Sequence, residues 1–462
     1  MPLSSPNDPS RKTPFSLIAK AFAPAPAAPP LAPEKVPGAL KFWQRRVLVS
    51  SIIGYAVYYF VRKNIGISIP AMEQDLGIGK AQLGLFLTLH GVLYGVSKFT
   101  NGFLGDRCNA RVFMVVGLAA SAGFNLLFGF SSAAVALGIF WLLNGWVQGM
   151  GFPPCARLMT HWYTPQKLIT RMAVWNASHT IGGLCIVVLC GYLVVVDWRL
   201  CFIVPAVIAL VCSVYLWKTL PDTPASVGLP EVSQAAVKKT EGSPGAPDFA
   251  EILKNNVFGN KYIWLLAVAN FFVYTIRYAV LDWGPTLLKE VKHVEITHAG
   301  WMVAGFEFSG LVGTLVAGWL ANRFFGGRCI RVCLLYMLLV VVAVLLFWRC
   351  AGDSRLLNTV LLGVIGFLIY GPQSLVGAAA ANLATKHAAA TAIGLTGFFG
   401  YASTVLSGWG LGALVTARGW DAVFVGLGVA GVAGAVLFAV AWPAKAHGYQ
   451  ELGSPGDNKG KA

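Results

Sequence analysis

Runs of about 20 predominantly apolar residues recur along the chain, and short polar segments separate them. A helix of that length crosses the roughly 30 Å of hydrocarbon in a bilayer. We predict twelve spanning helices, near residues 44–66, 81–103, 112–130, 133–156, 172–195, 199–219, 260–282, 299–321, 330–349, 355–380, 390–415 and 420–442. The pattern indicates an all-α membrane protein with six helices on each side of a polar stretch.

Composition divides the chain into five parts. Residues 1–40 are rich in proline and alanine, and we expect a disordered tail there. Residues 221–258 are polar, and we expect a flexible linker. The two six-helix bundles then occupy residues 41–220 and 259–443, and residues 444–462 form a second tail.

The distribution of charge predicts how these helices are oriented. Only 12% of the residues are charged, against about 25% in soluble domains, and the formal net charge is +16. Most of the basic residues fall in loops on one side of the twelve-helix pattern, which the positive-inside rule assigns to the cytoplasm. Both tails and the linker are then cytoplasmic. Lys20 and the prolines interrupt any cleavable signal peptide.

Several classes of function find no support in the sequence. In a membrane protein, an excess of basic residues indicates which loops are cytoplasmic. We therefore expect the lipid bilayer, and no nucleic acid, as a partner. The nine cysteines are an odd number and include no C-x-x-C pair, which argues against disulfides and a zinc site. We find no nucleophile–base pair, metal cluster or nucleotide-binding loop, and therefore expect neither an enzyme nor a cofactor.

The two halves repeat several features at a constant offset. Arg62 and Arg277 lie inside apolar runs, and each follows a tyrosine by three residues, Tyr59 and Tyr274. The arginines are 215 residues apart, as are the tyrosines. The loop residues Gly102, Asp106, Arg107 and Arg111 recur as Gly318, Asn322, Arg323 and Arg328, with an offset of 216 at the glycine. Glycine–proline breaks at 149–154 and 370–375 also correspond. The halves are therefore pseudosymmetric, as in transporters with a midplane site.

A charge within the bilayer costs roughly 2.5–3.5 kcal/mol on insertion scales, so Arg62 and Arg277 call for a physical reason. One reading is snorkelling, in which each guanidinium reaches the outer headgroups. The matched Y-x-x-R spacing favours the other reading, a central anion site with one arginine from each half. Guanidinium donates two parallel hydrogen bonds to phosphate, and two of them balance a dianion. An empty site would hold unpaired buried cations, which predicts exchange of one anion for another.

Other polar residues in the predicted helices could serve either the site or the packing of the helices. His179 is a ligand or a packing histidine, and Lys98 is a supporting charge or a snorkelling lysine. Asp282 and Glu307 could neutralise a cation when the substrate is absent. Asn144 and Gln148 either share a cavity face or join helices. The candidate hydroxyls are those of Tyr55, Tyr59, Tyr274, Tyr370 and Tyr401.

The loop pattern G-x-x-x-D-R-x-x-x-R at 102–111 resembles the signature of the major facilitator superfamily. Arg107 and Arg111 can anchor this loop to headgroups, and Asp106 can latch helix ends in one state. A narrower resemblance, over residues 41–440, is to the organophosphate:phosphate antiporter family. Its blocks here are GYAVYYFVRKN (54–64), GMGFPPCARLMTHWY (149–163), VWNASHTIGG (174–183), VYTIRYAVLDWGPTLLKEVKH (273–293), FLIYGPQSLVG (367–377) and GLTGFFGYAS (394–403).

This resemblance implies a fold and a set of site residues. Arg62 and Arg277 would bind the phosphoryl group beside His179, with Lys98, Asp282 and Glu307 in a charge network. The five tyrosines, Trp175 and Gln148 fall where the family has cavity residues. Phe152 and Thr180 depart from the common Trp and Asn of the family, and these departures leave the organic substrate open.

The leading hypothesis is a secondary transporter of a bacterial inner membrane, which we expect to work as a monomer. It would exchange glycerol 3-phosphate, phosphoglycerate or hexose 6-phosphate for inorganic phosphate by alternating access. One alternative is a non-transporting sensor of hexose phosphate that acts on a membrane kinase. Another is a proton-coupled organic anion carrier, with the proton on His179, Asp282 or Glu307.

Overall fold

A computed structural model describes residues 22–105, 108–232, 254–349, 354–384 and 389–444, and these residues contain helices and no strands. The helices of the N-terminal half are η1 (Pro33–Lys35), α2 (Val36–Phe60), α3 (Ile65–Leu76), α4 (Lys80–Gly105), α5 (Ala110–Gly129), α6 (Ala134–Gln148), α7 (Phe152–Trp162), α8 (Pro165–Val196), α9 (Leu200–Thr219) and η2 (Ala225–Val227). Those of the C-terminal half are η3 (Lys254–Phe258), α11 (Lys261–Val291), α12 (Ile296–Phe325), α13 (Cys329–Arg349), α14 (Arg355–Leu383), α15 (Ala389–Ala402), η4 (Val405–Gly410) and α16 (Leu411–Val440).

These helices account for the twelve predicted spans. Among the described residues, nine segments are long and apolar enough to cross a membrane. One of them, residues 391–440, contains two spans, because Gly419 leaves the helical region with a φ of 74° and turns the chain. Helix α4 and the pair α2–α3 supply the other two spans. The all-α fold with two six-helix bundles is confirmed.

The breaks within the spans differ in part from those predicted. Span 4 is interrupted between α6 and α7, as the glycine–proline sequence at 149–154 predicts. Helix α14, in contrast, continues through Pro372, so the predicted break at 370–375 is absent. Proline removes one hydrogen bond from a helix, and the surrounding helices tolerate that loss.

Span 1 has a break that the sequence did not predict. The chain leaves the helix between α2 and α3, and Arg62 and Lys63 lie in this gap. The carbonyl oxygen of Val61 accepts hydrogen bonds from Asn125 Nδ2 (3.0 Å) and Asn144 Nδ2 (2.9 Å). Because an unpaired carbonyl is costly in a membrane, these two amides stabilise the interruption.

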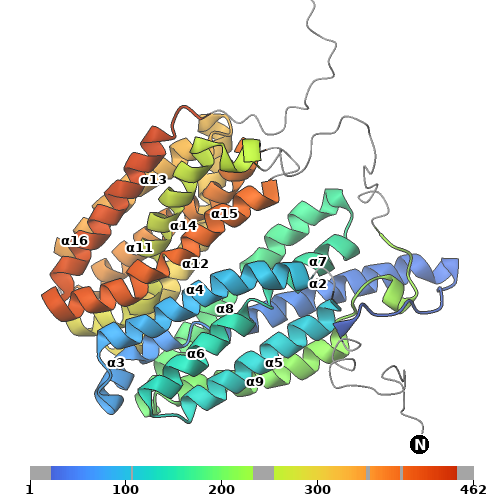
Figure 1. The fold of residues 1–462 in the computed structure, drawn as a ribbon, viewed down its shortest axis with the longest axis horizontal. Helices are drawn as coiled ribbons and strands as arrows, with labels where there is room; N and C mark the ends of the chain where they lie inside the picture. The colour runs from blue at the N-terminus through green and yellow to red at the C-terminus, as the bar shows by residue number, and fades with distance from the viewer. Residues whose placement is uncertain (1–21, 106–107, 233–253, 350–353, 385–388, 445–462) are drawn as a thin grey trace, which may run out of the picture.

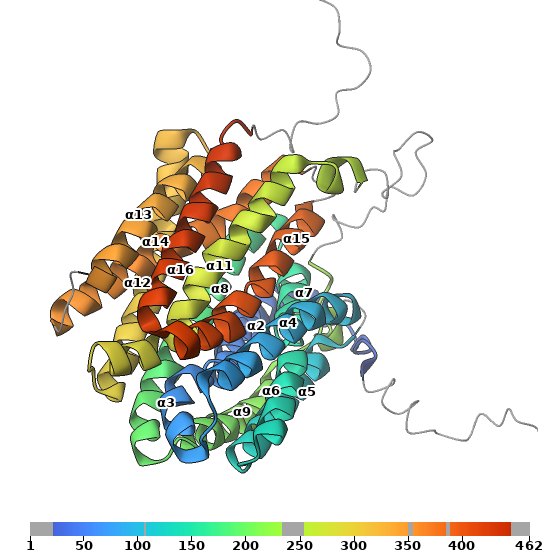
Figure 2. The same cartoon turned by 60° about the vertical axis from the view of Figure 1, so that its left-hand side comes forward.

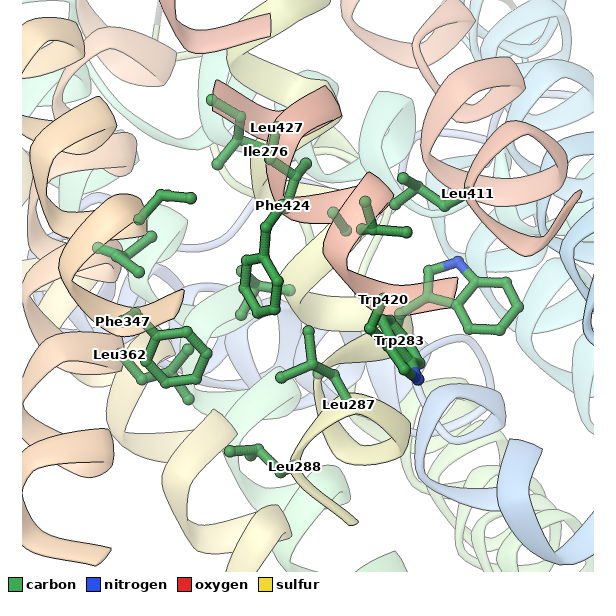
Figure 3. Close-up of a pocket in the computed structure, with 16 residues that line it drawn as sticks. Ile276, Trp283, Leu287, Leu288, Phe347, Leu362, Leu411, Trp420, Phe424 and Leu427 are labelled. Carbon is green, nitrogen blue, oxygen red and sulfur yellow. The ribbon is translucent and has the colours of Figure 1, made fainter. Parts of the chain in front are cut away.

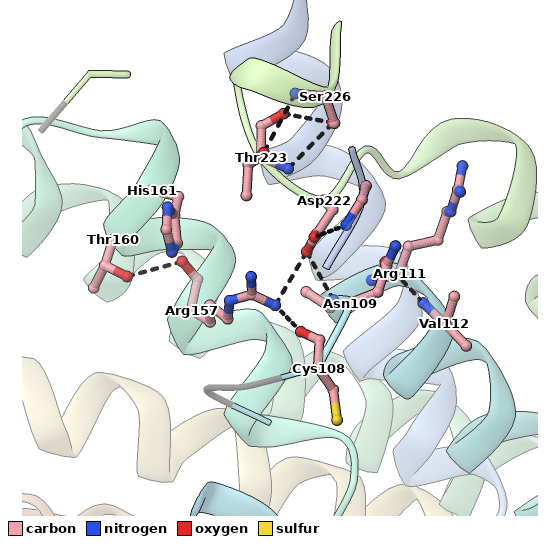
Figure 4. A network of polar contacts seen from close by, with 12 residues as sticks. Cys108, Asn109, Arg111, Val112, Arg157, Thr160, His161, Asp222, Thr223 and Ser226 are labelled. Atoms are coloured by element: carbon pink, nitrogen blue, oxygen red, sulfur yellow. Dashed lines mark hydrogen bonds and ion pairs between the residues drawn. The ribbon is translucent and has the colours of Figure 1, made fainter. Parts of the chain in front are cut away.

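The segments on either side of the N-terminal bundle pack against it. We predicted a disordered tail over residues 1–40, whereas α2 already begins at Val36 and Ala25 donates its N–H to Asp222. The structure describes the start of the predicted linker, residues 221–232, but not residues 1–21 or 233–253. Asp222 also accepts the N–H of Ala110 and lies 3.1 Å from Arg157, which donates to the carbonyl oxygen of Cys108 (Figure 4). This buried carboxylate therefore joins the tail, the α4–α5 loop, α7 and the linker.

The two bundles lie side by side and meet near α3, from which their other ends spread apart (Figures 1 and 2). Three close contacts between the halves lie at this end, which we call the joined end. Lys80 Nζ lies 3.0 Å from Glu290 Oε1, and Thr297 donates to the carbonyl oxygen of Gly191. Thr88 donates to the carbonyl oxygen of Thr404, next to the π-helical segment η4. The predicted topology makes the joined end extracytoplasmic.

Candidate functional site

Arg62 projects from the break in span 1 into aromatic surroundings. Its side chain is 7% exposed, so it is buried in protein and does not extend into lipid. The guanidinium carbon lies 3.8 Å from the centre of the Tyr94 ring and 5.3 Å from that of Tyr59. In the described part of the chain, no carboxylate lies within ion-pair distance of Arg62. Tyrosine side chains, and no carboxylate, surround this charge, which leaves guanidinium N–H groups available to an anion.

Arg277 lies at the matching position in the other half, on the uninterrupted helix α11, and is 5% exposed. Its surroundings are different. Its Nη2 donates to the Tyr370 hydroxyl (2.9 Å) and lies 3.9 Å from Glu307 Oε1. The same hydroxyl donates to Glu307 Oε2 over 2.5 Å. A carboxylate and a phenol therefore share the Arg277 charge, as expected for a buried cation.

A second cation–carboxylate pair connects the two halves. Lys63, next to Arg62 in the break, lies 2.9 Å from Asp282 Oδ1, on α11. Its ammonium also lies 4.5 Å from the centre of the Tyr278 ring. Asp282 thus neutralises a lysine rather than an arginine. Sequence reasoning assigned Asp282 to the charge network but missed Lys63, although it directly follows Arg62.

Several side chains lie near both arginines. Tyr59, Tyr278 and His179 all interact electrostatically with both guanidinium groups. The rings of Tyr59 and His179 are 5.8 Å apart. His179 donates from Nδ1 to the carbonyl oxygen of Asn176, and its Nε2 lies 3.4 Å from the Thr180 hydroxyl. This arrangement satisfies the neutral ring, and it places His179 in the cluster that the sequence predicted.

Lys98, on α4, completes the set of cations. Its ammonium lies 4.5 Å from the centre of the Phe152 ring and 5.4 Å from that of Tyr401, a residue of the other half. No carboxylate of the described residues lies within ion-pair distance of it. Lys98 therefore contributes a second charge without an acidic partner, next to the contact between α4 and α15.

A chain of aromatic rings connects these charges across the two halves. The Tyr94 and Tyr401 rings are 4.9 Å apart, and those of Tyr401 and Tyr274 are 5.9 Å apart. Sequence reasoning named Tyr274 and Tyr401 but missed Tyr94 and Tyr278. The sequence could have indicated both tyrosines, since Tyr94 precedes Lys98 by one helical turn and Tyr278 directly follows Arg277.

Three further predicted site residues are buried in the N-terminal half. Gln148 is 3% exposed and donates to the carbonyl oxygen of Tyr58 and to Ser121, so it joins helices. Trp175 is fully buried against Tyr55, with ring centres 4.7 Å apart, and Tyr55 is 6% exposed. Tyr55 also lies against Tyr59, with ring centres 5.7 Å apart, so it borders the cluster. Gln148 and Trp175 support the residues around them.

The described residues of the loop motif lie at the end of α4 and the start of α5. Arg111 packs over the Trp217 ring at 5.0 Å. Gly102 lies near the end of α4, whereas Asp106 and Arg107 lie outside the described residues. The latch role that we predicted for Asp106 therefore stays a prediction.

One apolar pocket lies on the other side of α11, within the C-terminal bundle (Figure 3). Its lining includes Trp283, Leu287, Phe347, Trp420 and Phe424, and it contains no charged side chain. This lining provides no charged side chain that could bind a phosphate group. The charged cluster at the interface between the halves is therefore the candidate site. Within the described residues, no group of three His, Cys, Asp or Glu side chains could hold a metal ion.

Comparison with known proteins identifies the family of this chain. Residues 51–408 match the family model described as Major Facilitator Superfamily. The chain is 39% identical to a glycerol-3-phosphate transporter of Bacillus subtilis, over 91% of this chain and 97% of that protein. It is 38% identical to a probable hexose phosphate transport protein of Chlamydia pneumoniae, with 87% and 92% covered. It is 35% identical to the membrane sensor protein UhpC of Escherichia coli, with 90% and 96% covered.

A solved structure shows the same fold at low sequence identity. It is the inward-facing, unoccupied form of a bacterial homologue of the human lysosomal transporter Spinster, with a TM-score of 0.70. The two chains are 15% identical, and the match covers 86% of this chain and 95% of the other.

Proposed function

We propose a phosphate-exchange function for this chain, which belongs to the Major Facilitator Superfamily and, within it, to the group that contains the glycerol-3-phosphate and hexose-phosphate transporters it matches. The chain would carry a phosphorylated small metabolite across the membrane in exchange for inorganic phosphate. The two halves would rock about the central site, so that it faces one side of the membrane at a time.

The single observation that carries this proposal is the pair of buried arginines, one from each half. Arg62 and Arg277 are 7% and 5% exposed, and both lie near the same three side chains, Tyr59, Tyr278 and His179. A guanidinium offers a planar pair of donors that matches two phosphate oxygens. A phosphoryl group held by both arginines would connect the two halves directly.

The ion pairs of the site support exchange rather than one-way transport. Two of its cations already have acidic partners, Lys63 with Asp282 and Arg277 with Glu307. Arg62 and Lys98 have none among the described residues. When the empty transporter reorients, the site must pass through a state that is closed to both sides of the membrane. Two buried positive charges would then lack a counter-charge, which costs free energy in a low dielectric. A bound dianion removes that cost, so each reorientation would need one.

Exchange in proteoliposomes tests the proposal. We expect vesicles loaded with phosphate to take up radiolabelled phosphate and glycerol 3-phosphate, and phosphate-free vesicles to take up little of either. Vesicles in which the protein binds these anions but never exchanges them would overturn the proposal. A pH gradient that drives net uptake without internal phosphate would instead indicate a proton-coupled carrier.

A sensor is the second candidate, because the chain is 35% identical to the membrane sensor protein UhpC. A sensor would bind the same anions and would act on a membrane kinase rather than exchange them. The proteoliposome experiment separates the two functions. Binding without exchange, combined with co-purification of a kinase, is the result that a sensor predicts.

We also propose that the protein works as a monomer in a bacterial inner membrane, with both termini in the cytoplasm. The distribution of basic loops supports this orientation. Reporter proteins fused to either end test it, since only a cytoplasmic terminus gives an active cytoplasmic reporter.

A further inference from the structure

Six charged side chains occupy interior stretches of the described helices and the span 1 break, where the two halves meet. Four are cations and two are acids; they are Arg62, Lys63, Lys98, Arg277, Asp282 and Glu307. The formal charge of the site is therefore +2. Helix α15, which also faces the site through the α4 contact, contains no charged residue.

The histidines near the site do not change this sum. His179 is satisfied as the neutral ring, because Nδ1 donates to a carbonyl oxygen and Nε2 faces the Thr180 hydroxyl. His90, on α4, uses Nδ1 toward the carbonyl oxygen of Trp141. Its Nε2 is buried without a partner, so a proton there would be an unsatisfied buried donor.

The charge of the site matches one class of phosphate compound. Phosphate and its monoesters carry a charge of about −2 above their second pKa of roughly 6. Inorganic phosphate and an ester with an uncharged organic part would thus each bring the site to neutrality. An ester that also carries a carboxylate has a charge of about −3 and would leave one negative charge unbalanced in a low-dielectric site.

The positions of the acids strengthen this discrimination. Lys63 and Arg277, the cations with acidic partners, lie 2.9 Å and 3.9 Å from Asp282 and Glu307. A substrate carboxylate that approached either cation would meet a protein carboxylate of the same sign. Arg62 and Lys98 lack acidic partners among the described residues. A phosphoryl dianion bound by Arg62 and Arg277 would balance this excess of two positive charges, and no positive charge would remain for a carboxylate.

We infer that the site selects phosphate monoesters whose organic part is uncharged, such as polyol or sugar phosphates, over esters that also carry a carboxylate. This inference rests on the proposed exchange function. It assigns the discrimination to the sum of the six charges, and in particular to Asp282 and Glu307.

Competition against phosphate self-exchange tests the inference at a pH near 8. Glycerol 3-phosphate and glucose 6-phosphate should inhibit labelled phosphate exchange at concentrations about tenfold lower than 3-phosphoglycerate. Equal inhibition by all three, in vesicles that exchange phosphate normally, would overturn the inference and leave the proposed function intact. Absence of phosphate self-exchange would overturn the proposed function itself.

A charge-changing variant makes the test specific. Asp282→Asn raises the formal charge of the site to +3, and we expect the preference for uncharged esters over 3-phosphoglycerate to fall by about tenfold. Asp75→Asn is the matched control, since Asp75 binds Trp198 and Arg199 within the N-terminal half, away from the site. The preference of Asp75→Asn for uncharged esters over 3-phosphoglycerate should equal that of the unmodified protein.

A second readout covers the case in which Asp282→Asn no longer exchanges phosphate. Displacement of labelled phosphate from the purified variant then gives the same ratio of affinities at equilibrium. An unchanged ratio in Asp282→Asn, by either measurement, contradicts the assignment of selectivity to the summed charge.

Discussion

The two halves of the site have arginines at matching positions and different partners around them. The N-terminal half contributes Arg62, Lys63 and Lys98, three cations and no acid. The C-terminal half contributes Arg277 with both acids, Asp282 and Glu307. At the joined end the division is weaker, because Lys80 of the first half pairs with Glu290 of the second and also with Glu73 of its own half.

The halves also differ in backbone. Arg62 lies in a break between two helices, whereas Arg277 lies on the continuous helix α11. Side-chain amides stabilise the break, and the ordinary helical hydrogen bonds stabilise α11. The repeated sequence thus fixes the positions of two guanidinium groups, while the unrepeated residues give each one a different electrostatic state. We interpret the N-terminal half as the anion-attracting side and the C-terminal half as the side whose cation is released from its acid on binding.

The largest expected effect comes from replacing either arginine. Arg62→Lys and Arg277→Lys should each reduce phosphate exchange by about 100-fold or more, because an ammonium cannot reproduce the two parallel hydrogen bonds. Calorimetric titration should separate them, with the greater loss of phosphate affinity in Arg62→Lys, whose charge has no acidic partner. Nearly normal exchange in either variant would contradict the paired site.

Next in size is the effect of destabilising the break. Asn144→Leu removes one of the two amides that donate to the Val61 carbonyl, and we expect a loss of about 2 kcal/mol in stability. Thermal unfolding in detergent measures it. The control in the other half is Thr275→Val, whose hydroxyl donates to Phe271 within the intact helix. That variant should lose less than about 1 kcal/mol, since the helix keeps its own hydrogen bonds. Equal losses would mean that the amides do not stabilise the break.

A smaller effect is expected when the acid beside Arg277 is neutralised. Glu307→Gln keeps an acceptor for the Tyr370 hydroxyl but leaves the arginine charge unpaired. Phosphate should bind about tenfold more tightly and exchange about tenfold more slowly, because the empty site becomes costlier to reorient. Equilibrium binding and proteoliposome exchange measure the two changes. Weaker binding in this variant would show that Glu307 positions Arg277 rather than neutralising it.

The smallest effect is expected at the joined end. Lys80→Met removes the ion pair with Glu290, whose side chains are 14% and 31% exposed, together with the pair to Glu73. It should change the balance between conformations by less than about 1 kcal/mol. The exchange rate should then change by less than about fivefold, and high salt should abolish the difference. Glu73→Gln is the control, because it removes only the partner of Lys80 within its own half. A larger change in Glu73→Gln than in Lys80→Met would contradict a role for the contact between halves.

Much of the fold followed from the sequence because lipid constrains helices strongly. Apolar runs of about 20 residues have few alternatives in a bilayer, so twelve spans could be placed to within several residues. The break in span 1 could not be predicted, since it depends on Asn125 and Asn144 of neighbouring helices reaching the Val61 carbonyl. Continuity through Pro372 likewise depends on packing around α14 rather than on local sequence.

For the site, the sequence indicated residue types, and the tertiary structure decided their pairing. The constant offset between Arg62 and Arg277 was enough to predict one anion site between two repeats, because buried charge requires a partner. Which acid meets which cation depends on how the halves pack. Asp282 pairs with Lys63 across the interface, and Glu307 pairs with Arg277 within its own half. Ion pairs act over a few ångströms, whereas these partners are separated by up to 219 residues along the chain.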